Sequence, residues 1–229
     1  MRMTTAGVRA APAGIEGVVA RMRRLAQALP PRDGVAVFNR VYLTVTEEIG
    51  QRVAAGAFEN RVTATELDVR FAARYLTAVD GEAAGRRAPA CWRPLFHMRG
   101  HPAVRPLQFA LAGINAHIGH DLPLALADTC VALGLEPCAL EGDFDRVGEV
   151  LVALEERVRD GLAPELVDVA DPLTHLVGAW SLDAARAAAW TTFRALFAMR
   201  ELPDVTEEFT ERLDAAVGLV SRCLLTPLG

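Results

Sequence analysis

Apolar residues recur every three or four positions along most of the chain, which is the spacing of one face of an α-helix. No segment shows the strict alternation of a half-buried strand or the turn of a β-hairpin. The pattern predicts helices over 15–29, 34–55, 63–80, 92–98, from near 103, and over 122–133, 143–160, 181–199 and 204–225. We therefore expect an all-α, bundle-like domain of seven to nine helices.

Polar residues that can accept hydrogen bonds from free backbone amides predict where these helices begin. The expected N-caps and capping boxes are Asp33, Asp143, Ser181, Thr63 with Glu66, and Asp204 with Glu207. Residues 1–13 lack the helical pattern and are expected to form a flexible arm, and 161–180 an irregular connection. Because no linker is long enough to separate two domains, we expect residues 14–229 to form a single one.

The composition fits an ordinary globular protein and argues against several functional classes. Hydrophobic residues make up 52% of the chain and the formal net charge is −5, so no basic excess is present to bind a nucleic-acid backbone. The four cysteines show no CxxC spacing, which favours free thiols in a reducing compartment. The N-terminus lacks a signal-peptide pattern, and no apolar run is long enough for a membrane span. We expect a cytoplasmic protein that binds neither nucleic acid nor a membrane.

The segment GINAHIGHDLPLA, at 113–125, concentrates polar residues between two apolar runs. On a helical projection, His117 and Asp121 lie together on the flank of the apolar stripe, whereas His120 points further round and Asn115 falls on the other flank. Side chains four residues apart on a helix contact each other. We predict that His117 and Asp121 face inward and form a polar site in the helical core.

Two chemistries use such a pair. Asp121 could orient and polarise His117 as a general base, because a carboxylate fixes the imidazole tautomer and stabilises the charged ring. Alternatively, both side chains could bind a divalent metal ion, with zinc favoured and His175 as a third ligand. A purely structural alternative is that Asp121 caps the next helix, since Leu122 precedes Pro123 and the residue before proline avoids helical geometry.

Further polar residues lie on or beside apolar stripes elsewhere. Tyr42 belongs to the stripe of the second helix and is expected to contact the substrate. Glu48, on the edge of that stripe, is either a second acid or base, or the half-exposed ion-pair partner of Arg52. Arg186 lies inside the apolar arc of its helix. Because a buried arginine needs a partner, we expect Arg186 to meet an acidic side chain or a substrate anion.

Several segments resemble an actinobacterial family of helical proteins of unknown function. They are FNRVYLTVTE at 38–47, LQFALAGINAHIGHDLPLAL at 107–126, LEGDFDRVGEVL at 140–151 and AWSLDAARAAAW at 179–190. The resemblance spans roughly residues 30–200 and is most specific in the core Asn-Ala-His-Ile-x-x-Asp-Leu. It implies an intact helical domain and transfers no activity.

A second resemblance is to the helical zinc-dependent phospholipase C and S1/P1 nucleases, which place HxxxD on a core helix with a proline shortly after. His117, Asp121 and Pro123 match that arrangement here. The likeness implies two ligands of a zinc site. Because this chain has five histidines in all, it implies at most one or two metal ions rather than the three of that group.

These observations favour a small-molecule enzyme. The expected catalytic residues are His117, Asp121 and Glu48. The expected substrate-binding residues are Asn115, Arg186 and Tyr42. With a metal-bound water the expected reaction is a hydrolysis. Without a metal it is an isomerisation or cyclisation of an apolar substrate in a biosynthetic pathway. The alternative is a non-catalytic ligand-binding or interaction protein whose inward polar residues form a core network, and association into a homo-oligomer stays open.

Overall fold

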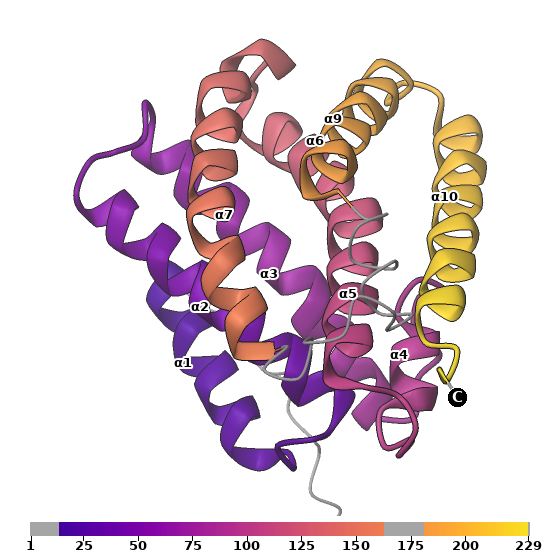
Figure 1. Cartoon of the computed structure of the whole chain (residues 1–229). Coiled ribbons are helices and arrows are strands. Elements are labelled where there is room, and N and C mark those ends of the chain that lie inside the picture. The colour runs from indigo at the N-terminus through magenta and orange to yellow at the C-terminus, as the bar shows by residue number, and fades with distance from the viewer. Residues whose placement is uncertain (1–13, 163–180, 229) are drawn as a thin grey trace, which may run out of the picture.

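The computed structural model describes residues 14–162 and 181–228, and these residues form helices joined by loops (Figure 1), without a strand. The elements are α1 (Gly14–Ala28), α2 (Gly34–Ala54), α3 (Arg61–Ala83), α4 (Arg93–Met98), α5 (Pro106–Ala116), the π-helical η1 (His117–Asp121), α6 (Leu122–Leu133), the 3₁₀ turn η2 (Pro137–Leu140), α7 (Glu141–Leu162), α9 (Leu182–Ala198) and α10 (Pro203–Leu224). The prediction of an all-α, bundle-like domain is confirmed. The expected arm at 1–13 and residues 163–180 of the expected connection lie outside the described residues.

The caps that depend on local sequence are confirmed at two helices. The Asp33 carboxylate accepts a hydrogen bond from the backbone N–H of Val35 at 2.8 Å, at the start of α2. The Ser181 hydroxyl accepts one from the backbone N–H of Ala184 at 3.2 Å, at the start of α9. Both residues satisfy amides that have no partner inside the helix.

Three expected caps are wrong. Helix α3 begins earlier than predicted, because the Asn60 side chain caps it and places Thr63 inside the helix. Helix α10 begins at Pro203 without a side-chain cap, so Asp204 lies in its first turn. Asp143 also lies inside its helix, α7, and its carboxylate accepts hydrogen bonds from the backbone N–H groups of Glu59 and Asn60. It therefore anchors the start of α3.

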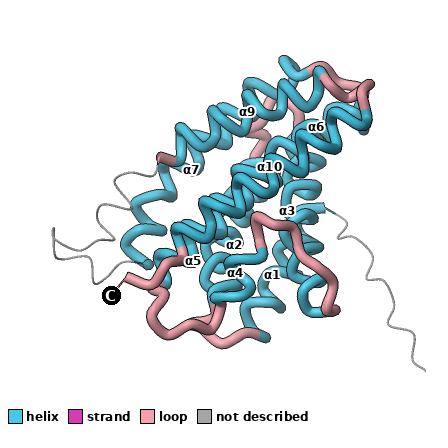
Figure 2. The backbone as a smooth tube through the Cα atoms, turned by 90° about the vertical axis from the view of Figure 1, so that its right-hand side faces the viewer, coloured by secondary structure: helices cyan, strands magenta, loops and turns pink. Residues whose placement is uncertain are grey.

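The continuous stretch α5–η1–α6 forms the centre of the fold. Helices α2 and α10 both pack against α5, on its left and right in Figure 1. Helices α3 and α9 pack against α6, and α7 contacts α2. Figure 2, seen from the α10 side, shows α10 running along the front of the bundle. The polar residues of η1 are therefore surrounded by other helices.

The π-helical turn η1 carries the predicted site residues. Its wider turn lets the backbone N–H of Leu122 donate to the carbonyl of His117, five residues earlier. Asp121 keeps helical dihedral angles, and its side chain makes no cap to α6, so the expectation that it caps the next helix is wrong. Single π turns of this kind are rare and often occur at functional sites.

Among the described residues, no single helix is both long enough and apolar enough to cross a membrane. The stretches 106–133 and 137–151 are long and apolar enough for a membrane span only when they are taken together, and a bend of 110° separates them.

Close packing between α2 and α5 yields a testable prediction. A Cβ atom added at Gly113 would overlap the buried Phe38 ring. Although alanine favours a helix over glycine by ~1 kcal/mol, overpacking of a core typically costs about 1–3 kcal/mol. We therefore expect Gly113→Ala to lower the free energy of unfolding measured in urea. Gly100→Ala is the matched control, because a Cβ there meets no atom, and equal effects of the two changes would contradict the described packing.

Candidate active site

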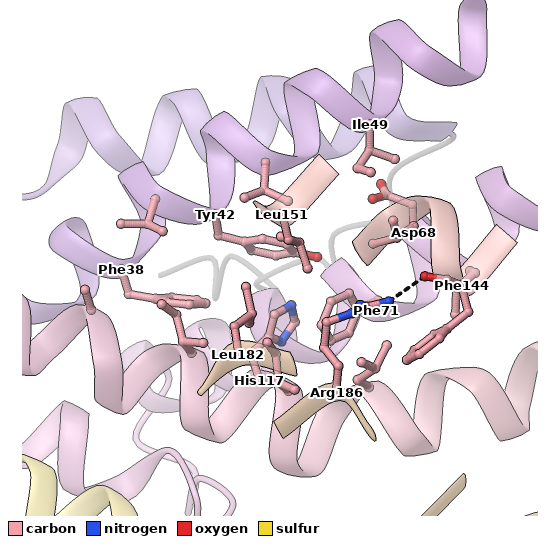
Figure 3. Close-up of a pocket in the computed structure, with 18 of the residues that line it drawn as sticks. Phe38, Tyr42, Ile49, Asp68, Phe71, His117, Phe144, Leu151, Leu182 and Arg186 are labelled. Carbon is pink, nitrogen blue, oxygen red and sulfur yellow. Dashed lines mark hydrogen bonds between the residues drawn. The ribbon is translucent and has the colours of Figure 1, made fainter. Parts of the chain in front are cut away.

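A cavity of about 200 Å³ lies beside η1, between side chains of α2, α3, α5, α7 and α9. Its wall is mainly aliphatic and aromatic (Figure 3). The polar and charged side chains that line it are Tyr42, Asp68, His117, Asp143 and Arg186. An apolar hollow with a few polar groups is the usual form of a small-molecule site.

His117 is held rigidly in the cavity wall. Its Nδ1 lies 3.0 Å from Oδ2 of Asp121. Its ring stacks on Phe71 with centroids 3.6 Å apart and an interplanar angle of 7°, and Tyr42 packs edge-on at 4.3 Å. The other ring nitrogen, Nε2, is buried without a hydrogen-bond partner among the described residues. The predicted pairing of His117 with Asp121 is therefore present, and it leaves Nε2 free.

The Asp121 carboxylate is fully buried and accepts three hydrogen bonds. Trp92 Nε1 donates to Oδ2 at 3.0 Å, and Nδ1 of His120 lies 2.9 Å from Oδ1. The third partner is His117, whose Nδ1 faces Oδ2. The zinc pair implied by the phospholipase resemblance stays a prediction. The arrangement is that of a carboxylate orienting an imidazole.

Hydrogen bonding and burial set the protonation of this pair. Burial alone would raise the pKa of Asp121, but hydrogen bonds from His117 and His120 outweigh it and hold that pKa below its ordinary value. Burial lowers the pKa of His117 below 6.5, and the Asp121 carboxylate offsets only part of this effect. At neutral pH, His117 is therefore uncharged, donates from Nδ1 to Asp121 and carries a lone pair on Nε2.

Asp68 and Tyr42 add two further polar groups to the same wall. Burial raises the pKa of Asp68 to about 7, and Oδ2 of this residue has no hydrogen-bond partner among the described residues. Burial, followed by the nearby Asp68 carboxyl, raises the pKa of Tyr42 well above its ordinary value, so the phenol stays protonated. Thr46 donates its hydroxyl to the Tyr42 carbonyl oxygen, and within the described part of the chain the Tyr42 hydroxyl has no hydrogen-bond partner.

Arg186 lines the cavity from α9, as its place on the apolar arc predicted. Its guanidinium donates from Nη2 to the Phe144 carbonyl oxygen at 2.5 Å and lies 4.4 Å from the centre of the Phe144 ring. Burial lowers the pKa of Arg186. A Cβ at Gly148 would overlap the guanidinium, so this glycine makes room for it. No acidic side chain forms an ion pair with Arg186 in the part of the chain that the structure describes, although the charges of Asp183 and Asp145 raise its pKa against the effect of burial.

The other predicted site residues lie elsewhere. Glu48 does not line the cavity and pairs with Arg52 at 2.9 Å, as the ion-pair alternative expected. Asn115 donates to the Val217 carbonyl and to the Ser221 hydroxyl, and so joins α5 to α10. His175 lies outside the described residues.

Asp68 is the cavity residue that sequence reasoning missed. The signal was present, because Asp68 shares one stripe of α3 with Ala64, Ala72 and Tyr75, all of which are buried. A carboxyl at such a position either has a partner or raises its pKa. Asp143 also lines the cavity, but its carboxylate is committed to the backbone at 59–60.

The fold and this site define an all-α protein in which a buried His–Asp pair faces an apolar cavity. The chain belongs to the Family of unknown function (DUF5995), whose model matches residues 15–227. The expected membership of a helical family of unknown function is thus confirmed. No curated protein and no solved structure matches the chain.

The raised pKa of Asp68 predicts a pH-dependent gain in stability on its removal. The folded-state pKa of about 7 exceeds the ordinary value of 3.8, so the wild-type protein loses stability as the pH rises through this interval. We expect Asp68→Asn to raise the free energy of unfolding at pH 8 by up to a few kcal/mol, since one pKa unit is worth ~1.4 kcal/mol. At pH 4 the gain should vanish.

Urea unfolding at the two pH values measures this effect. The control is Glu66→Gln, on the same helix but half-exposed and paired with Arg70. That change should alter stability little at either pH. A difference between Asp68→Asn and the wild type that does not depend on pH would show that Asp68 is ionised and accommodated in the folded state.

Proposed function

We propose that the protein is an acid–base enzyme, an isomerase or cyclase, that acts without a catalytic metal on an apolar small molecule bound in the cavity. The observation that carries this proposal is the free Nε2 of His117, buried in the cavity wall while Nδ1 is held by Asp121. A neutral imidazole in this orientation is a general base whose charged form the carboxylate stabilises.

The proposed reaction begins with transfer of a proton from a carbon of the substrate to Nε2 of His117. The imidazolium that forms is stabilised by the hydrogen bond from its Nδ1–H to Asp121. Negative charge left on the substrate is stabilised by hydrogen bonds from the Tyr42 hydroxyl and protonated Asp68, the other polar groups of the wall that have no partner among the described residues. Return of the proton to a different carbon completes an isomerisation, with no change in overall composition.

The lining defines the substrate class. Most of the wall is aliphatic or aromatic, which favours an apolar body, and Arg186 supplies a cation for a carboxylate or other anionic group. The hydrolase alternative requires His117 and Asp121 to share a metal ion, whereas they bond to each other. A cytoplasmic location, and the absence of nucleic-acid and membrane partners, belong to the same proposal, and homo-oligomerisation stays open.

A generic carbon acid tests the base directly. The probe is 5-nitrobenzisoxazole, a compact apolar compound that opens to a coloured phenolate when a base removes its ring proton. We expect the wild-type protein to accelerate this reaction and His117→Ala to reduce the rate at least ~100-fold, the usual contribution of a positioned base. Helical content by circular dichroism should stay unchanged.

The control for this substitution is His97→Ala, since His97 is exposed and does not line the cavity. This variant should keep the wild-type rate. A wild-type rate no higher than that of the His117→Ala protein would leave a ligand-binding role for the cavity and would refute the catalytic proposal.

The rate of probe opening should depend on pH in a defined way. Because burial lowers the pKa of His117, the base is uncharged at neutral pH, and the rate should fall on the acid side as the pH drops below 6.5. On the alkaline side the rate should fall as Asp68, whose pKa is about 7, loses the proton that it donates. Asp121 raises the pKa of His117 against the effect of burial, while His120 and Arg74 lower it. Asp121→Asn should therefore move the midpoint of the acid-side fall in rate to lower pH and reduce the rate reached above that midpoint. An unchanged midpoint would show that another group is the base.

A further inference from the structure

A second cluster of reactive side chains lies beyond Asp121, outside the cavity. It consists of Cys91 from the loop before α4, His120 from η1 and Asp214 from α10. One potential ligand atom from each residue lies within 4.8 Å of the other two. We propose that Cys91, His120 and Asp214 bind a divalent metal ion, with zinc as the metal.

The chemistry of the donors selects the metal. A thiolate, an imidazole nitrogen and a carboxylate oxygen are the three ligand types of protein zinc sites, and the soft sulfur disfavours calcium and magnesium. In a tetrahedral zinc site with bonds of about 2.0–2.3 Å, ligand atoms lie roughly 3.3–3.8 Å apart. Nε2 of His120 and Oδ1 of Asp214 are 3.8 Å apart, which is already the spacing of two zinc ligands. The Cys91 thiol, which belongs to the same group of atoms within 4.8 Å of one another, completes the set by moving inward.

The groups around the cluster already orient two of its ligands. Nδ1 of His120 pairs with Oδ1 of Asp121 at 2.9 Å, so a neutral His120 turns the lone pair of Nε2 toward Asp214. Histidines that bind metals commonly donate their other N–H to a carboxylate in this way. The Asp214 carboxylate accepts from the backbone N–H groups of Ala90 and Cys91 at 2.7 and 2.9 Å, which fixes it and leaves each oxygen a further lone pair.

Burial of the three side chains defines how an ion would enter. Cys91 is fully buried and His120 is 7% exposed, whereas the Asp214 side chain is 22% exposed. The cluster therefore opens toward solvent on the α10 side. Three protein ligands leave a fourth position for water on that open side, as in zinc sites that are not closed by a fourth side chain.

Asp121 connects this site to the cavity through its two oxygens, Oδ1 toward His120 and Oδ2 toward His117. Metal binding nevertheless does not depend on the proposed catalysis, because neither His117 nor any other cavity residue supplies a ligand. The two proposals can therefore fail separately.

Cobalt(II) titration of the full-length, chelator-treated protein tests the site. We expect one ion per chain, intense visible bands of a tetrahedral complex, a near-ultraviolet thiolate-to-cobalt band, and displacement of cobalt by zinc. Cys91→Ser should abolish the thiolate band and weaken zinc binding at least tenfold. Cys130→Ser, which removes another buried thiol, and Cys138→Ser, which removes an exposed one, should leave the band intact.

Asp214→Asn provides a second variant if Cys91→Ser does not fold, since Asp214 is partly exposed; it should also weaken zinc binding at least tenfold. His117→Ala should bind zinc as the wild type does. The proposal is overturned if the wild type shows no thiolate-to-cobalt band, if Cys138→Ser removes that band, or if Asp214→Asn binds zinc unchanged. It is equally overturned if His117→Ala abolishes zinc binding, which would place the metal at the cavity.

Discussion

The buried carboxylate of Asp121 is the constraint on which the rest of the structure depends. A carboxylate removed from water is costly unless hydrogen bonds replace its hydration. Here the three donors are Trp92, His117 and His120, one from the start of α4 and two from the π turn. Satisfying this charge fixes the orientation of both imidazoles. Nε2 of His117, a residue of the cavity wall, is consequently left without a partner among the described residues, and Nε2 of His120 lies 3.8 Å from Asp214.

The fold could be predicted from the sequence wherever the determining contacts are local. Apolar spacing located the helices, and Asp33 and Ser181 cap helices in their own segments. Prediction failed where a contact with a residue distant in the sequence determines the role of a side chain. The Asp143 carboxylate has the right residue type for a cap, but it serves the backbone at 59–60, more than eighty residues earlier. The sequence around 143 does not indicate that partner, because the contact exists only after α7 has packed near the start of α3.

In the site, too, local contacts could be predicted and distant contacts could not. Helical spacing alone placed His117 beside Asp121 and put Arg186 on an apolar face. It could not decide whether Glu48, on the edge of a stripe, turns inward or pairs with its neighbour one turn on. A helical projection also placed His120 away from the pair, whereas in the π turn its ring reaches the same carboxylate. Cys91 and Asp214 are separated by more than one hundred residues, so only the packing of α10 brings them together.

The distribution of unpartnered polar atoms is the feature of the structure that favours a ligand site over a polar core network. A buried polar atom without a hydrogen bond costs about 1–3 kcal/mol, and a core network avoids this cost by satisfying its own members. Four such side-chain atoms occur among the described residues, and three of them, on Tyr42, Asp68 and His117, belong to the wall of one cavity. Their concentration there, next to an otherwise apolar lining, leaves a place for a molecule that supplies the missing partners. If a ligand binds there, as we propose, the stability lost in the empty protein is recovered on binding, which is how a preorganised site gains affinity.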